Sequence, residues 1–132
     1  MMSEHTIHLI GGEDDETASI TSSPKEGRCH VSFRYRGRAI EESASDYFEA
    51  LCRVRLRLES EKLIPFCYGA SLNVFPSGMA RDMGAGLKAY RLTIGKHAQE
   101  LVGIFDEGAD VIPATVARQK EYFDEWLKSP KA

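Results

Sequence analysis

The residues best suited to chemistry lie in one stretch, residues 68–90. It mixes glycines, small polar groups, cations and large apolar side chains, a mixture that neither a bland loop nor a buried strand requires. Ser77 and Gly78 come just before an expected helical turn, where backbone N–H groups and a hydroxyl would face an anion. Arg81 and Lys88 would add positive charge. The predicted ligand-binding residues, for a phosphate or carboxylate group, are Ser71, Asn73, Ser77, Gly78, Arg81, Lys88 and Tyr90.

A structural interpretation of the same stretch stays open. Its spacing matches neither the Walker nor the dinucleotide-binding fingerprint. In that interpretation Ser71, Asn73 and Ser77 cap their own backbone, and Arg81 pairs with Asp82 or with a more distant acid.

Catalytic and metal chemistry have weaker support. Cys67 and His97 would make a nucleophilic pair only with a thiolate, a close base and an oxyanion hole, and the sequence fixes none of these. Asp106, Glu107 and Asp110 do not follow the calcium-loop pattern, and the histidines lack zinc-site spacing. We therefore predict no catalytic residue, no metal and no cofactor.

Composition bounds the class of protein. A chain of 132 residues with 42% hydrophobic and 28% charged residues is typical of one globular domain. A net charge of −3 argues against a general grip on nucleic acid. No signal peptide or membrane-length apolar run is visible, so we expect no membrane association. Three widely spaced cysteines fit free thiols in a reducing, cytoplasmic compartment.

The thiols are expected to differ in reactivity. Cys29 and Cys52 have apolar neighbours, which predicts raised thiol pKa values and slow reaction with reagents. Cys67 directly precedes the polar stretch and is the one thiol near polar loop residues, while the neighbouring Phe66 indicates burial. Fast labelling of Cys67 alone would favour an enzyme.

The elements that position the stretch follow from periodicity. Residues 1–27 are predicted to be an N-terminal arm and a mobile acidic loop, and residues 28–132 one α+β domain. Residues 28–36 alternate as a half-buried strand, with a short return over 39–41. A helix is expected from an N-cap at Ser43 through Leu58, with its arginines on the outer surface.

The second half of the domain is predicted to begin with a strand at residues 63–68. A hairpin of residues 87–94 and 100–105 is expected to follow the polar stretch. The last helix begins near Pro113, and its Phe123 and Trp126 are expected to close the core. The predicted fold is a single α+β domain, a mostly antiparallel sheet with two main helices on one face.

The stretch also carries a resemblance. Its pattern, Tyr-Gly-Ala-x-x-Asn-Val-x-Pro-Ser-Gly-Met-x-Arg-x-Met-x-x-Gly-x-Lys-Ala-Tyr, resembles a small family of uncharacterised bacterial proteins. Gly95-Lys96, Phe105-Asp106 and the closing Gln119, Phe123, Trp126 and Ser129 extend the similarity over the last two-thirds of the chain. The family has no established activity, so the resemblance implies a bacterial source but no chemistry. The chain is also similar in size to immunity proteins of bacterial toxin systems.

Two functions are consistent with these patterns. The first is a non-enzymatic binding protein with a protein partner, of an immunity-like or regulatory kind. The alternative is a phosphate- or small-molecule-binding protein, extending to an enzyme, that uses residues 68–90. A concave pocket that gathers the predicted residues would favour the small ligand, and a flat or convex surface would favour the protein partner.

Overall fold

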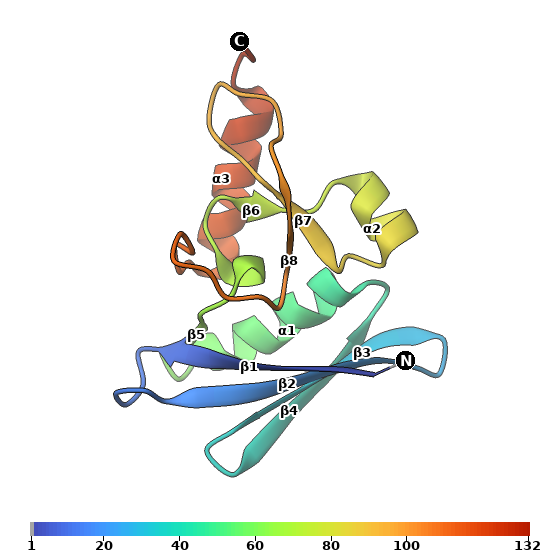
Figure 1. Cartoon of the computed structure of the whole chain (residues 1–132), viewed down its shortest axis with the longest axis vertical. Coiled ribbons are helices and arrows are strands. Elements are labelled where there is room, and N and C mark those ends of the chain that lie inside the picture. Colours follow the sequence, from blue (N-terminus) through green and yellow to red (C-terminus); the bar gives the residue numbers. More distant parts are fainter. Residues whose placement is uncertain (1) are drawn as a thin grey trace.

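The computed structural model describes residues 2–132. It contains two antiparallel sheets, which lie on opposite sides of one helix (Figure 1). The larger sheet has the order β4-β3-β2-β1-β5, from β1 (Ser3–Ile10), β2 (Thr17–Lys25), β3 (Arg28–Tyr35), β4 (Arg38–Ala44) and β5 (Ile64–Pro65). The smaller sheet has the order β6-β7-β8, from β6 (Val74–Phe75), β7 (Lys88–Arg91) and β8 (Leu101–Gly103). The helices are α1 (Tyr47–Glu59), α2 (Gly78–Gly84) and α3 (Val116–Lys128), with a 3-10 turn, η1 (Tyr68–Ala70). The predicted α+β class is confirmed, although its strands form two sheets.

The larger sheet buries one face against α1. Phe33 lies opposite Ile20 on β2 and Ile40 on β4, and all three side chains are buried. This is the alternation expected for residues 28–36, because successive side chains of a strand point to opposite faces. The opposite face of the sheet is polar, and Ser32 and Arg34 lie on it between the buried positions.

The prediction of a mobile N-terminal loop was wrong. Thr17–Lys25 forms β2, which pairs along its length with both β1 and β3. Its inward side chains, Ala18, Ile20 and Ser22, are buried, while hydroxyls occupy the alternate positions. Two small residues in the inward row made the segment too weakly hydrophobic to be recognised, yet pairing on both sides satisfies its backbone.

Helix α1 begins later than expected. Asp46, not Ser43, is its N-cap, and the Asp46 carboxylate accepts a hydrogen bond from the Glu49 backbone N–H at 2.8 Å. Ser43 and Ala44 instead end β4. The expected apolar stripe is confirmed, since Leu51, Val54 and Leu58 have no exposed surface among them.

The smaller sheet carries the hairpin expected from the sequence, although its strands are shorter. Lys88 lies opposite Gly103, and Tyr90 opposite Leu101. Helix α3 packs against β6 and α1, but its one fully enclosed side chain is Gln119. Phe123 and Trp126 are only half-buried, so the expectation that they close the core was wrong. They stack in series on Phe75 instead.

A buried polar pair joins the two halves of the molecule. The Arg55 side chain, 1% exposed, donates from Nη1 to the Gln119 Oε1 at 2.6 Å and to the Gly69 carbonyl at 2.9 Å. Its Nη2 donates to the Ala114 carbonyl at 3.1 Å. Burial lowers the pKa of this guanidinium, because removal from water disfavours its charged form.

Gln119 completes the pair with its amide nitrogen. Nε2 contacts the carbonyl oxygens of Gly69, Ser71 and Val74 at 3.0, 2.9 and 2.9 Å. One amide thus fixes η1, the loop after it and the start of β6. Arg55 belongs to α1, so the prediction that all the arginines of this helix face outward was wrong.

We expect Arg55→Met to lower the free energy of unfolding by about 3 kcal/mol or more, because several buried oxygens lose their donor. Arg57→Met is the matched control, since Arg57 is exposed on the same helix and makes one ion pair with Glu42 at 3.2 Å. The control should cost about 0–1 kcal/mol. Equal denaturation midpoints for the two variants would contradict the central role of Arg55.

Candidate functional site

The candidate site is built around α2, the short helix inside the predicted stretch. Ser77 is its N-cap, and the hydroxyl accepts a hydrogen bond from the Ala80 N–H at 3.0 Å. The helix ends at Ala85, whose φ of 54° is left-handed, and the Ala85 carbonyl accepts from the Tyr47 N–H at 2.8 Å. At Gly86 a Cβ would meet the Asp46 carboxylate at 2.9 Å, so the exit of α2 lies directly on the start of α1.

Helix α2 buries none of its own side chains. Met79 is 70% exposed and Met83 82% exposed, and their four-residue spacing places them on one face. With Tyr90 and Leu101 they line a shallow hollow of about 370 Å³, whose one charged lining residue is Lys88. We call these five residues the α2 surface.

Three of the predicted residues meet at this hollow, namely Ser77, Lys88 and Tyr90. Lys88 is exposed and makes no ion pair within the described part of the chain. Gly78 is the exposed first residue of α2 and lines the neighbouring hollows instead. The hydroxyl of Ser77 is already used as the helix cap.

Arg81 points to the other side of α2. Its Nη1 lies 3.1 Å from the Asp46 carboxylate, which is almost fully buried. Its guanidinium also lies over the rings of Phe48 and Phe75, at 5.1 and 5.5 Å from their centroids. Arg81 therefore pairs with a distant acid, which was one of the two structural alternatives, and Asp82 stays exposed.

A second hollow lies on this side, between α1, α2 and α3. Its volume is about 440 Å³, and we call it the α1–α3 cleft. Its lining residues are Phe48, Glu49, Cys52, Leu56, Phe75, Pro76, Gly78, Arg81, Val116, Gln119, Lys120 and Phe123.

Ser71 and Asn73 belong to the scaffold. Ser71 has no exposed surface, and its hydroxyl donates to the Asn73 Oδ1 at 2.9 Å while accepting from the Ile112 N–H at 2.9 Å. The Asn73 carbonyl accepts from the Leu92 N–H at 2.7 Å. The predicted residues therefore do not converge: they divide between the α2 surface, the α1–α3 cleft and the scaffold.

Burial raises the thiol pKa of both Cys29 and Cys52, as expected. Cys67 has no exposed surface, and burial raises the pKa of its thiol to about 11. Burial likewise raises the pKa of Cys52 to about 11, an effect that the nearby Arg55 guanidinium partly opposes. Cys29 is the one half-buried thiol. Cys67 is therefore not a ready nucleophile near neutral pH, although it directly precedes the polar stretch.

The acidic residues of the loop after β8 are used separately. Glu107 contacts the His8 ring at 2.9 Å, and Asp106 lies 3.8 Å from the His5 ring. Asp110 accepts from the Tyr68 hydroxyl at 2.6 Å. No group of three potential metal ligands occurs within residues 2–132.

Sequence analysis missed two polar clusters on the larger sheet. In the first, the His30 ring bridges the Ser43 hydroxyl and the Glu41 carboxylate, both at 2.7 Å. The alternation of residues 28–36 does place His30 on the outer face, but its partners follow only from the register between β3 and β4.

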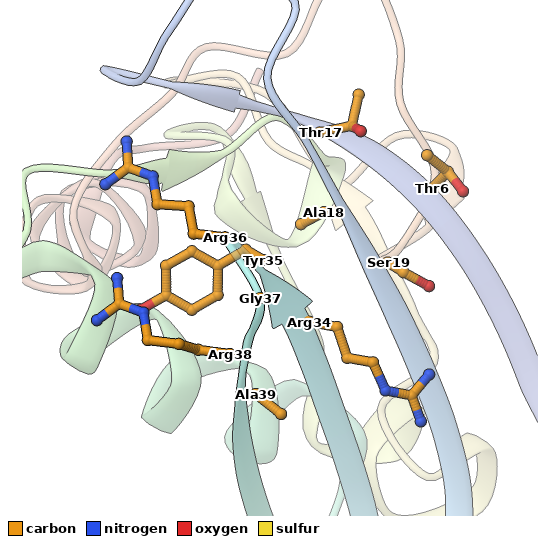
Figure 2. Close-up of a pocket in the computed structure, with 10 residues that line it drawn as sticks. All are labelled: Thr6, Thr17, Ala18, Ser19, Arg34, Tyr35, Arg36, Gly37, Arg38 and Ala39. Atoms are coloured by element: carbon orange, nitrogen blue, oxygen red, sulfur yellow. The ribbon is translucent and has the colours of Figure 1, made fainter.

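The second cluster is a shallow hollow of about 710 Å³ at the turn between β3 and β4. Figure 2 shows Arg36 and Arg38 on one side of it with Tyr35, and Arg34 on the other side. Arg36 binds the Glu16 carboxylate with two nitrogens, at 2.6 and 2.9 Å. Arg38 pairs with Glu61 at 2.6 Å. Internal acids thus neutralise two of its three arginines.

The comparisons with known proteins identify no family for this chain. No protein-family model matches the chain, and no significant relative is found among curated proteins. The bacterial family proposed from residues 68–90 stays a prediction. None of the helices in the described residues is long and apolar enough to cross a membrane.

We expect a thiol reagent to label Cys29 first and to reach Cys52 and Cys67 only after unfolding. Burial disfavours both thiolates, because their pKa values of about 11 lie far above neutral pH. Mass spectrometry of the labelled protein, with and without denaturant, identifies the modified residues. Fast native labelling of Cys67 would restore the nucleophilic interpretation.

We expect Arg81→Met to lower the free energy of unfolding by about 1–3 kcal/mol with or without phosphate, because the buried Asp46 carboxylate loses a partner. Lys88→Met is the control and should change stability by less than about 0.5 kcal/mol. Thermal scans with and without phosphate measure both effects. Phosphate stabilisation of the wild type that Arg81→Met abolishes would contradict this and identify Arg81 as an anion ligand.

Proposed function

We propose that this chain is a non-enzymatic binding protein whose α2 surface docks onto a protein partner. The observation that carries the proposal is that α2 buries none of its side chains and exposes Met79 and Met83. The face of α2 that carries these methionines adds no side chain to the core and contributes little to folding, so another role best explains why it is apolar.

The residue types suit a protein surface. Methionine is unbranched and polarizable, so it adapts to irregular partners, and it is over-represented at binding surfaces. Tyr90 adds an aromatic anchor, and Lys88 adds a cation with no internal partner. Helix α2 also projects from the side of the molecule, where a partner would meet it first (Figure 1).

The shape of the site favours a partner over a small anion. The predicted residues do not gather in one pocket, and the hydroxyl of Ser77 and the guanidinium of Arg81 are used internally. The alternative is a phosphate-binding protein, extending to an enzyme. Of its predicted ligand residues, Lys88 and Tyr90 stay available at an open hollow. We infer an immunity-like or regulatory role in the bacterial cytoplasm: the size of the chain supports the immunity-like role, the resemblance of residues 68–90 the bacterial source, and the three free cysteines the cytoplasm.

The test replaces both methionines with glutamate, which keeps helix propensity but adds charge to the α2 surface. Ile112→Glu is the matched control, since Ile112 is 48% exposed and lies outside both the α2 surface and the α1–α3 cleft. We expect wild type and control to retain one stoichiometric partner in a pull-down from the native host, and the double variant to lose it. Circular dichroism should show all three folded.

Two outcomes would contradict the proposal. A partner that the double variant still retains would place the interface elsewhere. Phosphate or a nucleotide that raises the melting temperature of the wild type, with no partner captured, would favour the alternative.

A further inference from the structure

We propose that the α1–α3 cleft binds a small monocarboxylate that carries an aromatic or branched hydrocarbon body. This site is separate from the α2 surface, and its occupancy does not depend on the proposed partner.

The floor of the cleft is apolar and held in place. Phe75 of β6 contacts Phe48 of α1 edge to face, with ring centroids 5.1 Å apart. It stacks on Phe123 of α3 at 4.1 Å. Phe75 and Phe123 are only half-buried, so two separate elements present ring surface to the cleft, while Phe48 of α1 is buried and supports Phe75. A volume of about 440 Å³ lies within the range of small-molecule sites.

Two cations border this floor. The Arg81 guanidinium lies over Phe48 and Phe75, and the Lys120 ammonium lies 5.6 and 5.1 Å from the centroids of Phe75 and Phe123. Each has one acidic partner, Asp46 for Arg81 and Asp124 for Lys120. A guanidinium has five N–H donors and an ammonium three, so both keep donors for a ligand.

The donors that stay unused select a single negative group. Each ionisable lining residue has one partner of opposite charge, Asp46 for Arg81, Asp124 for Lys120 and Arg53 for Glu49, so the charges of the lining are balanced without a ligand. The remaining N–H donors of Arg81 and Lys120 suit a group that only accepts hydrogen bonds, and Glu49 would repel a dianion such as phosphate. A carboxylate matches the planar guanidinium in shape as well as in charge.

The polar groups of the lining set the orientation. The Gln119 amide is fully used by Arg55 and by three carbonyl oxygens. The Cys52 thiol is buried and protonated near neutral pH. Gln119 therefore has no donor left for a carboxylate, and a thiol S–H is a much weaker donor than a cation. The hydrocarbon body lies against the rings, and the carboxylate lies between Arg81 and Lys120.

The test measures binding of 3-phenylpropionate to the full chain by isothermal titration calorimetry and by amide chemical shifts. The matched probes are 3-phenylpropanol, which lacks the negative charge, and acetate, which lacks the hydrocarbon body. We expect saturable binding of 3-phenylpropionate, with shifts centred on Phe75 and Phe123, and at least about tenfold weaker binding of either matched probe. Equal affinity for the alcohol and the acid, or no saturation by about 10 mM acid, would overturn the proposal.

Two substitutions test the residues without touching the core. Lys120→Met should weaken 3-phenylpropionate binding about five- to tenfold, whereas Lys128→Met, an exposed position on the same helix outside the cleft, should leave it unchanged. Glu49→Gln should strengthen it about two- to fivefold by removing the repulsive charge. Lys120→Met and Lys128→Met variants that bind equally, with no gain from Glu49→Gln, would overturn the assignment.

Discussion

Arg55 carries a permanent charge in a place that water does not reach, and its acceptors are neutral oxygens from η1, from the loop before α3 and from α3 itself. Isolated charges are costly to bury, so the cost is tolerable only while every one of these oxygens is in position. The arrangement of α1, η1 and α3 is therefore a single constraint. If one element shifts, the guanidinium loses hydrogen bonds that no solvent molecule replaces.

The same constraint explains why the two parts of residues 68–90 have different roles. Its first part is irregular backbone, and the Gln119 amide and the Ser71 hydroxyl satisfy the polar groups there. Its second part, α2, is tied to α1 through the Arg81–Asp46 pair, the contact of Arg81 with the Phe48 ring, the hydrogen bond from Tyr47 N–H to the Ala85 carbonyl and the close approach at Gly86. The face of α2 that carries Met79 and Met83 is thus not needed for packing, and its residues are free to serve a surface role.

The sequence predicted what depends on local periodicity. The alternation of β3, the apolar stripe of α1 and the β7–β8 hairpin are all present, because strand and helix periods act over a few residues. The central strand β2 was missed, since small residues fill part of its inward row and its stability comes from its neighbours. Arg55 was expected on the surface with the other arginines of α1, as most arginines are.

The limits for the site are similar. Composition directed attention to residues 68–90, and the cap at Ser77 was foreseen as one structural alternative. Which side chains meet was not foreseeable, because Arg81 turns toward Asp46 across 35 positions of sequence. Three separate elements contribute the aromatic residues of the α1–α3 cleft, so no local sequence pattern predicts it. Phe123 was expected in the core because its spacing is that of a buried stripe, whereas it borders this cleft.

The sequence distance between the two buried partners has a consequence for how the protein is made. Gln119 follows Arg55 by 64 positions, and the Ala114 carbonyl comes nearly as late. During synthesis from the N-terminus, β1 to β4 and α1 leave the ribosome while the cation that faces away from their sheet still has no acceptors. The side of α1 that carries Arg55 therefore stays exposed in the nascent chain until α3 has been synthesised and packs against it.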